Sequence, residues 1–334
     1  MSPFSFDPDA AQVTHSLHAH GLNVDATLAS GQAFSWRRTA TGHWRGWIDG
    51  RPCLVWQQGD ALRAVGPGLT IEAVSAYFGL QQPMEEIVAS FPADPWLDKA
   101  RAFAPGLRIL RQEPWETLCN FICSSLKQIT QIEQINHELR RNFGERCGDE
   151  LYAFPDAARL AQTTEAQLRA CRLGFRAKHL HVAASQIASS EVSLDRIATL
   201  PTTEAREQLL RVRGVGEKVA NCVLLFAYGR AEAFPIDVWV ERVLRRLYFR
   251  RNAKPDHHKL TAFAQEHFGP YGGYAQQFLF HWIRTAPSAL PPERPVRARA
   301  PRKPVPKVVA KKAELSQHKA EFAVARAGSA RVRR

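Results

Sequence analysis

A lysine in an expected helix start, followed one helix later by an aspartate, has the clearest potential for covalent chemistry in this chain. Gly214-Val215-Gly216 precedes an apolar stretch, Lys218 lies in the first turn expected there, and Asp237 follows Phe-Pro-Ile. Glycines let a backbone approach a phosphate closely, and helix-start amides attract anions. Such a lysine is a candidate nucleophile, and a nearby aspartate could control its charge. The combination predicts covalent chemistry on a nucleic acid.

The spacing around Lys218 places it beside an apolar helix face. If the helix starts near Val215, the residues at helical spacing on one face are all apolar: Val215, Val219, Val223 and Phe226. Lys218 and Cys222 lie one turn apart on a neighbouring row. Burial there favours the neutral amine, which is the attacking form. The alternative is a solvated lysine on an ordinary amphipathic helix.

Asp237 also allows two interpretations. It precedes Val-Trp-Val-Glu-Arg-Val-Leu, so its side chain is well placed to cap the helix that this pattern predicts. The helix dipole would favour the charged carboxylate at that position. A structural cap and a catalytic carboxylate are therefore compatible.

The composition limits the class of protein. A chain of 334 residues can hold about two domains, and it contains no apolar run long enough to span a membrane. The N-terminal residues lack the basic and apolar segments of a secretory signal. The six cysteines form neither a CxxC pair nor a metal-type cluster, which predicts no metal site and fits a reducing compartment. Cys119 and Cys123, one helical turn apart in apolar sequence, are expected to be buried thiols.

Most of the net positive charge lies at the C-terminal end. The chain carries a formal charge of +13, and residues 287–334 contain thirteen Lys/Arg against three Asp/Glu. This Pro- and Ala-rich tail is expected to be disordered. It would either add nonspecific phosphate affinity or act as a solubilising extension. The rest of the chain is only slightly basic, so a DNA-binding function must come from its motifs.

The predicted fold class is α+β. Alternating runs at 33–36 and 53–56, separated by Gly and Asp turns, predict an antiparallel β-rich N-terminal domain over 1–95 that includes a short helix at 71–78. Residues 96–286 are expected to form a mainly α-helical domain, and 287–334 the basic tail. Thr164 and Gln167 predict a capping box. The main helices are expected at 115–143 (as one or two), 166–171, 177–189, 203–212, 215–228, 238–249, 260–268 and 274–284.

The motif around Lys218 and Asp237 resembles that of the helix-hairpin-helix DNA glycosylases, and most closely their 8-oxoguanine DNA glycosylase branch. The resemblance covers nearly all of the chain outside the tail, and its most specific part is Gly-Val-Gly-x-Lys followed by Pro-Ile-Asp. It implies that the hairpin amides of Gly214, Val215 and Gly216 bind a DNA phosphate. It also implies that Lys218 attacks C1′ of the sugar with assistance from Asp237.

Four remote residues match the base-binding positions of the same branch. Gly31, within Ser-Gly-Gln-Ala-Phe, resembles the glycine whose carbonyl accepts a hydrogen bond from the N7–H of oxidised guanine. Gln276 and Phe280, one helical turn apart, resemble the glutamine that reads the Watson–Crick edge and the phenylalanine that stacks on the base. Cys222 matches the residue on the other side of the base. Taken alone, Gly31 also fits an ordinary turn, and Phe280 an ordinary core residue.

Two more residues match the segment that enters the DNA. Phe175 resembles the aromatic wedge that fills the gap left by an extruded base, and Arg176 resembles the arginine that follows it. Trp239 stands where these enzymes often have a histidine that contacts a phosphate, so the resemblance leaves undecided whether this position contacts the DNA.

The chain departs from the better-known enzymes on the opposite-base side. Those enzymes carry asparagines after Cys-Ser-Ser, one of which contacts the estranged cytosine, whereas this chain has Leu126-Lys127-Gln128. Gln131 stands in place of a second cytosine-reading arginine. Leucine cannot read a base edge by hydrogen bonding, so the strict preference for cytosine opposite the lesion is expected to be relaxed, with Arg176 alone left to retain part of it.

The resemblance implies a bifunctional base-excision-repair enzyme, which removes 8-oxoguanine through a Lys218 Schiff base and nicks the strand by β-elimination as an AP lyase. It needs no metal or cofactor because the lysine supplies the electrons, and with no cysteine after Cys222 the iron–sulfur cluster of endonuclease III-type relatives is excluded. The alternatives are a monofunctional alkylbase glycosylase, which would lack the lysine, and a noncatalytic helix-hairpin-helix DNA-binding protein.

The same resemblance indicates the partner and the setting. The expected partner is double-stranded DNA containing oxidised guanine, without a membrane, and the protein is expected to act as a monomer. It would lie in the cytoplasm, associated with the nucleoid, in a bacterium, or in the nucleus of a eukaryote.

Overall fold

The computed structural model describes residues 14–148, 151–250 and 255–291. Most of the predicted basic tail, from residue 292 onward, lies outside these residues. The predicted start of the tail needs a correction, because Pro287–Ala289 form a short 3-10 turn (η3) and Leu290 is buried at 6 % exposure in an apolar cluster with the last helices. The folded part therefore continues past residue 286.

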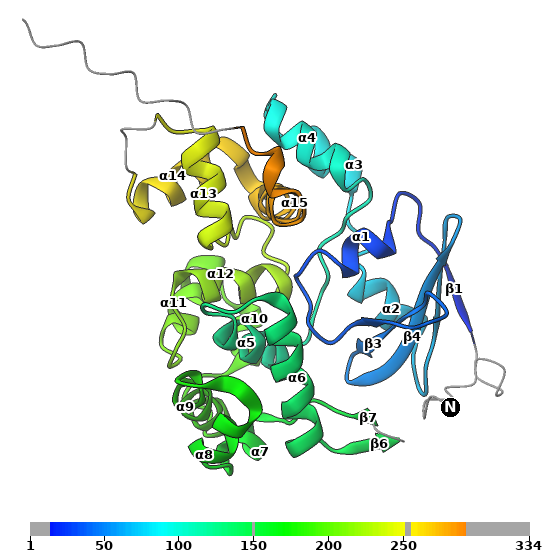
Figure 1. Cartoon of the computed structure of the whole chain (residues 1–334), viewed down its shortest axis with the longest axis vertical. Helices are drawn as coiled ribbons and strands as arrows, with labels where there is room; N and C mark the ends of the chain where they lie inside the picture. Colours follow the sequence, from blue (N-terminus) through cyan, green and yellow to red (C-terminus); the bar gives the residue numbers. More distant parts are fainter. Residues whose placement is uncertain (1–13, 149–150, 251–254, 292–334) are drawn as a thin grey trace, which may run out of the picture. The chain divides into compact units, whose positions relative to one another are not determined.

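A five-stranded antiparallel sheet forms the N-terminal part, in the order β1-β5-β4-β3-β2 (Figure 1). A two-residue hairpin joins β3 to β4 at Asp49-Gly50, which have φ of 49° and 70°. Two-residue hairpins of this kind need positive φ at both positions, which Asp and Gly tolerate. The sheet confirms the antiparallel β-rich N-terminal domain. The strands are His15–His18 (β1), Arg37–Arg38 (β2), Trp44–Ile48 (β3), Arg51–Gln58 (β4) and Ala61–Val65 (β5).

Two short helices close the core of this sheet. They are α1 (Val24–Leu28) and α2 (Ile71–Tyr77), the second at the predicted position. Phe78, directly after α2, is fully buried in the same cluster as the sheet residues Val55 and Leu62.

The strand predicted over 33–36 is wrong. This segment is irregular, and β2 begins only at Arg37. The ring of Trp36 lies against Gly46 of β3, where any Cβ would clash, and its indole N–H donates to the Tyr77 hydroxyl at 2.6 Å. Ala33, Phe34 and Trp36 are all at least 96 % buried, so the apolar run reflects a buried loop that also contacts the helical part.

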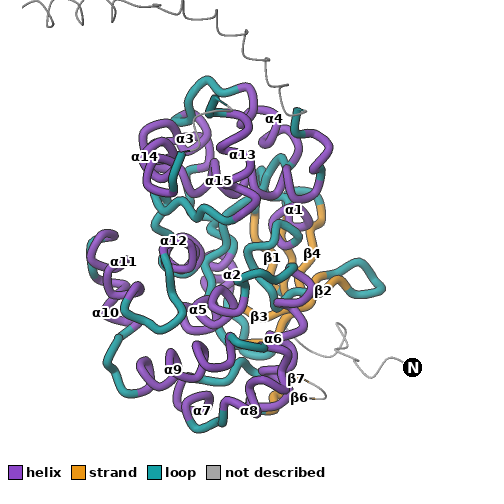
Figure 2. Tube along the Cα trace, turned by 60° about the vertical axis from the view of Figure 1, so that its left-hand side comes forward, coloured by secondary structure: helices purple, strands orange, loops and turns teal. Residues whose placement is uncertain are grey.

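The remainder of the described chain is mainly helical, as predicted (Figure 2). The stretch 115–143 forms two helices, interrupted at residues 124–128, where Leu126 has a φ of 54°. The capping box of Thr164 and Gln167 is present. The longer helices are α4 (Pro95–Phe103), α5 (Pro114–Cys123), α6 (Ile129–Phe143), α9 (Arg176–Ala188), α11 (Thr202–Leu210), α12 (Glu217–Phe226), α13 (Val238–Leu247), α14 (His257–Phe268) and α15 (Gly272–Thr285).

Shorter elements connect these helices: α3 (Met84–Ala89), β6 (Arg146–Gly148), β7 (Leu151–Tyr152), α7 (Ala157–Ala161), α8 (Glu165–Leu168), the π-helix η1 (Arg169–Leu173), α10 (Leu194–Thr199) and the 3-10 turn η2 (Gly269–Tyr271). In the described ranges, no helix is long and apolar enough to cross a bilayer.

The helices pack into two apolar clusters. One is centred on α5, α9 and α12 and includes the predicted buried thiols Cys119 and Cys123, both fully buried. The other joins α4 to α13, α14 and α15, so an early helix packs against the last one. The proposed catalytic helix α12 belongs to the first cluster, and the helix with Gln276 and Phe280 belongs mainly to the second.

Candidate active site

Lys218 lies in the first turn of α12, as predicted, and its amine is held by the protein. The helix begins at Glu217, slightly later than expected, with Gly216 as its N-cap. The Lys218 Nζ donates to Ser124 Oγ at 2.8 Å and lies 4.9 Å from the centre of the Phe121 ring. Lys218 is half-buried. The side chain therefore bridges α12 to the end of α5, which a fully solvated lysine would not do.

Asp237 caps α13, as predicted. Its Oδ1 accepts hydrogen bonds from the amides of Trp239 (3.0 Å) and Val240 (2.8 Å). Burial raises the pKa of this carboxyl, although the Val240 amide and the Lys218 charge oppose the shift.

Cys222 shares an electrostatic environment with both catalytic candidates. Burial raises the pKa of its thiol to about 11, an effect that the Lys218 ammonium opposes and the Asp237 carboxylate reinforces. The thiol is only 2 % exposed. The structure thus brings together Lys218, Cys222 and Asp237, which are separated along the chain.

Gly31 lies directly against Phe280, although the two are far apart in sequence. Gly31 has a φ of 82°, and a Cβ there would lie 3.3 Å from Phe280 Cε1 and would clash with Ile129 Cδ1. Only glycine fits both the backbone conformation and this close approach. The predicted pairing of the glycine loop with the last helix is therefore a contact in the structure.

The loop that carries Gly31 is held from two sides. The buried Gln32 amide donates to the Arg108 carbonyl at 2.8 Å and accepts from the Leu110 amide at 2.8 Å. From α15, the Arg284 guanidinium donates to the Ala29 carbonyl at 2.7 Å. These bonds hold the backbone on both sides of Gly31, and the bond from Arg284 ties this loop to α15.

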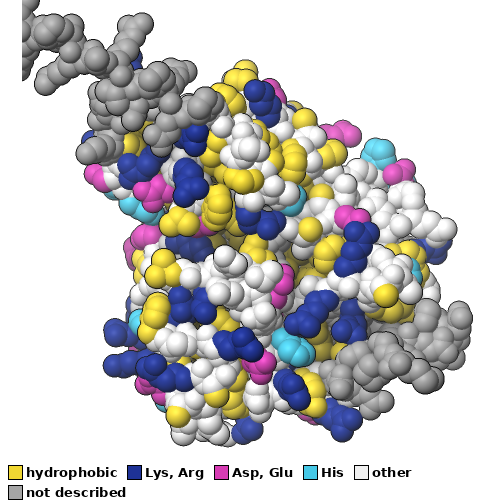
Figure 3. Space-filling view, viewed as in Figure 1, with side chains coloured by type: hydrophobic (Ala, Val, Ile, Leu, Met, Phe, Trp, Pro, Cys, Tyr) yellow, Lys and Arg dark blue, Asp and Glu magenta, His cyan; other side chains and the backbone are white. Residues whose placement is uncertain are grey.

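Gln276 is buried on α15, one turn before Phe280. It is 4 % exposed, and its Oε1 has no hydrogen-bond partner among the described residues. An unpaired buried amide oxygen costs about 1–3 kcal/mol, so such atoms are typical of sites that a ligand completes. The space-filling view shows a hollow lined by hydrophobic side chains between α12 and α15 (Figure 3).

The predicted wedge projects from the surface, while the arginine beside it does not. Phe175 is 53 % exposed, whereas Arg176 is 5 % exposed. Arg176 donates to the carbonyls of Ser125 and Leu173, and its guanidinium lies 4.2 Å from the centre of the Phe175 ring. Arg176 therefore joins the wedge to the loop that carries Leu126, which is 86 % exposed.

The hairpin before α12 offers part of the predicted set of amides. Gly214 has a φ of 88° and packs on His179, where a Cβ would clash. The Val215 amide already donates to the Val212 carbonyl at 3.1 Å, so in this conformation it is not available to bind a DNA phosphate as predicted. Within the described ranges no partner is seen for the first-turn amides of Glu217, Lys218 and Val219, and no atom lies within 4 Å of the Cβ position of Gly216.

Trp239 lies in the first turn of α13, beside Asp237. Its ring is half-buried, with the Arg242 guanidinium 5.0 Å from the ring centre. Its role in binding phosphate stays a prediction.

Sequence reasoning did not single out Ser124, Phe121 or Ile129 as site residues. Ser124 stands within the Cys-Ser-Ser segment that precedes the opposite-base positions, and this was the only signal for it. Phe121 and Ile129 look like ordinary apolar helix residues. Among the described residues, no group of three or more His, Cys, Asp or Glu side chains is placed to hold a metal ion.

Comparison with known proteins gives matches over most of the folded chain. The family model of the 8-oxoguanine DNA glycosylase N-terminal domain matches residues 16–118, and that of the HhH-GPD superfamily base excision DNA repair proteins matches 120–270. The probable N-glycosylase/DNA lyase of Methanothermobacter thermautotrophicus is 28 % identical over 267 residues, covering 71 % of this chain and 84 % of that relative.

Two solved structures are more similar. MBOgg1 in complex with a low-affinity DNA ligand superposes with a TM-score of 0.77 at 35 % identity, covering 82 % of this chain and 96 % of that one. The Clostridium acetobutylicum 8-oxoguanine glycosylase/lyase, in complex with double-stranded DNA containing cytosine opposite 8-oxoguanine, gives 0.75 at 32 % identity, covering 80 % and 93 %.

The fold and the matches to known proteins define this protein as a helix-hairpin-helix enzyme of base excision DNA repair. Within that superfamily, the chain belongs to the 8-oxoguanine DNA glycosylase branch, whose N-terminal domain it carries. Its enzyme class is that of the bifunctional DNA glycosylase/lyases, as the sequence predicted.

Proposed function

We propose that this protein excises 8-oxoguanine from duplex DNA through a Schiff base on Lys218 and then cleaves the strand at the resulting abasic site. The observation that carries the proposal is the half-buried Lys218 amine, bonded to Ser124 at 2.8 Å and grouped with Asp237 and Cys222. This amine lies at a helix start whose first-turn amides have no partner among the described residues, and an anionic DNA backbone would be attracted there.

The base would be extruded and held between Cys222 and Phe280. Gln276 would use its unpartnered Oε1 to accept a hydrogen bond from the Watson–Crick edge of the base. The Gly31 carbonyl would accept from N7–H, which 8-oxoguanine has and guanine lacks. One such hydrogen bond, lost and left unpaired, is worth about 1–3 kcal/mol, or about 5- to 150-fold in discrimination.

The chemistry would begin with the neutral Lys218 amine. Its nitrogen bonds to C1′ as the C1′–N9 bond breaks, and the departing base keeps that electron pair and takes up a proton. The sugar ring opens to give a Schiff base between Nζ and C1′. Loss of a C2′ proton then expels the 3′ phosphate and nicks the strand. Hydrolysis of the Schiff base returns the amine.

Asp237 would handle charge and protons beside this reaction. Since burial raises its pKa, it accepts a proton from the lysine or its adduct more readily than an exposed aspartate would. While ionised, it would stabilise cationic character on the sugar. Its two hydrogen bonds from the α13 amides hold the carboxylate in place for both tasks.

The DNA would meet an apolar edge beside the catalytic lysine. Phe175 and Leu126, both exposed, would enter the duplex at the gap left by the extruded base. The unpaired first-turn amides of α12, the backbone at Gly214 and Gly216, and the region of Trp239 would contact the phosphates.

The opposite base would be read with little selectivity. Leu126 fills space without making hydrogen bonds, and Arg176 is committed to the carbonyls of Ser125 and Leu173. Excision rates with C, A, G or T opposite the lesion should therefore differ by less than about tenfold, since one base-reading hydrogen-bond pair is worth about 1–3 kcal/mol. A Leu126→Asn variant should increase the preference for cytosine.

The rival functions differ in what they require. A monofunctional alkylbase glycosylase would not need a lysine held by Ser124 at the hairpin helix. A noncatalytic DNA-binding protein would not need the Asp237 carboxylate beside it, nor the Gly31–Phe280 contact.

The test is a strand-cleavage and base-release assay on matched duplexes. The protein is incubated with duplexes containing 8-oxoguanine or guanine at one position, with each of the four bases opposite. Release of 8-oxoguanine together with strand nicking, and little release of guanine, supports the proposal. Binding without base release would point to the noncatalytic alternative. Strong dependence on cytosine would overturn the opposite-base part alone.

A further inference from the structure

A cavity of about 360 Å³ lies between β3 and α6, lined by none of the residues assigned to catalysis or base binding. A volume near the lower end of the usual range for ligand pockets suits a small molecule or a single unit of a polymer. It is lined by Phe34, Ser35, Arg37, Arg45, Gly46, Trp47, Glu133, Asn136, His137, Arg140, Arg141, Leu151 and Tyr152.

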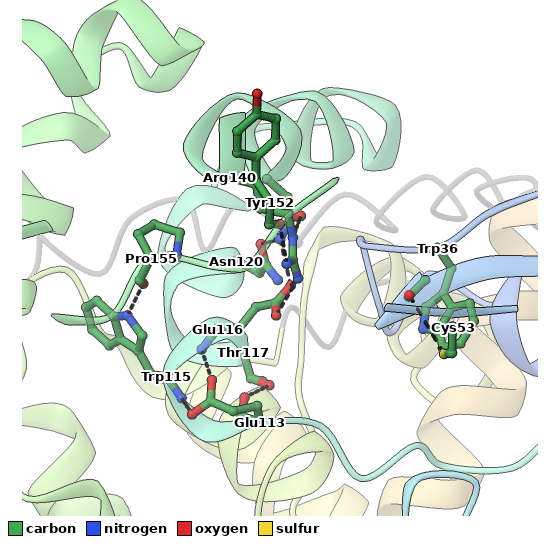
Figure 4. Close-up of polar contacts among 12 residues, drawn as sticks. Trp36, Cys53, Glu113, Trp115, Glu116, Thr117, Asn120, Arg140, Tyr152 and Pro155 are labelled. Carbon is green, nitrogen blue, oxygen red and sulfur yellow. Dashed lines mark hydrogen bonds and ion pairs between the residues drawn. The ribbon is translucent and has the colours of Figure 1, made fainter. Parts of the chain in front are cut away.

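Part of the cavity lining is a preorganised polar network (Figure 4). Arg140 on α6 donates to both carboxylate oxygens of Glu116 at 2.7 Å and to Asn136 Oδ1 at 3.0 Å. It also donates to the Tyr152 carbonyl at 3.2 Å, and its guanidinium lies 4.4 Å from the centre of the Trp47 ring. The charge of Arg140 is thus neutralised inside the protein, and the network holds β3, α6 and β7 together around the cavity.

The same cavity is also lined by arginine side chains that, among the described residues, make no hydrogen bond or ion pair of the kind that holds Arg140. Arg37 and Arg141 are exposed, and the guanidinium group of neither makes a hydrogen bond or ion pair within the part of the chain that the structure describes. Lys, Arg and His side chains gather where α6 lies beside β3 (Figure 3). Glu133 is the one carboxylate in the described lining.

The titration of the lining residues indicates a positive potential. The pKa of His137 is lowered, first by burial and then by the charges of Arg37, Arg141 and Arg45, while Glu138 opposes the shift. Burial raises the pKa of Glu133, and Arg37 opposes it. A neutral imidazole beside several guanidinium groups gives both hydrogen-bonding capacity and an unbalanced positive charge.

Aromatic and apolar side chains also line the cavity. Trp47 and Tyr152 are half-buried, as is Leu151, so each shows part of its surface to the cavity. Guanidinium groups suit phosphate oxygens, and aromatic side chains suit the faces of nucleobases. A metal ion is disfavoured by the positive charge, and a purely apolar ligand would leave Arg37 and Arg141 uncompensated.

We propose that the cavity between β3 and α6 binds a nucleotide unit, with its phosphate on Arg37, Arg141 and His137 and its base against Trp47. The nucleotide could be free or part of a DNA strand, because both present the same phosphate-and-base chemistry. This site is separate from the catalytic lysine, so nucleotide binding there can be tested independently of the excision reaction.

The test measures two probes on the full-length protein. Isothermal titration with dAMP measures binding of a free nucleotide, and fluorescence anisotropy with a short 5′-phosphorylated single-stranded oligonucleotide measures binding of a strand. Both are repeated on Arg37→Ala/Arg141→Ala and on a matched control, Arg169→Ala/Arg196→Ala, which also removes two exposed arginines. Urea unfolding checks that all proteins have the same midpoint. Trp47→Phe is included to test the aromatic wall.

Loss of two phosphate-binding guanidinium groups should weaken nucleotide binding by about 10- to 100-fold, while the control stays within about twofold of wild type. A loss seen only with dAMP assigns the site to free nucleotides, and a loss seen only with the oligonucleotide assigns it to a strand. If both probes bind the cavity variant and the control equally, or if neither binds wild type, the proposal is overturned.

Discussion

Replacing Gly31 by alanine should separate base recognition from strand cleavage. Two costs can be worked from the structure. At a φ of 82° an alanine is strained by about 1–2 kcal/mol, and its Cβ would clash with Ile129 Cδ1 and approach Phe280 Cε1 to 3.3 Å, an overpacking that costs about 1–3 kcal/mol. The reduced freedom of the unfolded chain returns about 0.4–1 kcal/mol. We expect a net destabilisation of about 1–5 kcal/mol.

Two variants isolate the steric part of this cost. Ile129→Val removes the Cδ1 atom that the new Cβ would meet, so the double variant Gly31→Ala/Ile129→Val should be more stable than the sum of the single effects by about 1 kcal/mol. Gly21→Ala is the matched control, because Gly21 has a φ of 68° but no atom within 4 Å of its Cβ position. Gly21→Ala should lose only the stability that backbone strain costs, and this loss should not change when Ile129 is replaced by valine.

The assay has two readouts, urea unfolding and cleavage kinetics. Moving the Gly31 carbonyl by even a few tenths of an ångström should reduce excision of 8-oxoguanine by about 10- to 100-fold. Cleavage at a preformed abasic site should change little, because that substrate has no base to read. Equal stabilities for the Gly31→Ala and Gly21→Ala proteins would refute the steric reasoning. Equal losses on the two substrates would refute the role of the Gly31 loop in base recognition.

Three further predictions concern charges and thiols. Burial raises the pKa of Asp237, so its contribution to stability is present below its ordinary pKa and is lost as pH rises through the pKa of the folded state. The unfolding free energy of Asp237→Asn should therefore rise relative to that of wild type between pH 3 and pH 7. A difference between the two proteins that does not change with pH would contradict this. Glu116→Gln should cost about 3 kcal/mol in urea unfolding because it leaves Arg140 buried without its carboxylate, and a loss under about 1 kcal/mol would show that the pair is not needed. The Cys222 thiol has a pKa of about 11 and is only 2 % exposed, so in the native protein it should resist a thiol reagent that modifies the exposed Cys147. Rapid labelling of Cys222 would contradict its burial.

The sequence predicted those helices whose apolar period repeats over several turns. The helices α5, α6, α12, α13 and α15 were all located, with ends shifted by a few residues at most. The helices α1, α3, α4, α7 and α10 were missed. All of these except α4 have only five or six residues, which contain too little of the helical period to stand out. Residues 33–36 misled the strand prediction because a buried loop can carry the same apolar residues as a strand.

Only those residues of the candidate site that belong to recognisable sequence motifs could be predicted. Lys218 and Asp237 were singled out from the motif itself, and Gly31 and Phe280 by resemblance. The structure places Gly31 against Phe280 and brings Lys218 within electrostatic reach of Asp237. The hydrogen bond from Lys218 to Ser124 could not be predicted, since it depends on how α5 packs against α12. The orientation of Arg176 could not be predicted either, because burial against the Ser125 loop turns its guanidinium toward the protein.

The measurement that tests the central claim most directly is borohydride trapping on an 8-oxoguanine duplex. Borohydride reduces a Schiff base to a stable amine, so a covalent protein–DNA adduct reports attack by Lys218. We expect the adduct with wild type and none with Lys218→Gln, while the variant still binds the duplex. An adduct that persists in Lys218→Gln, or wild-type base release with no adduct, would contradict the account.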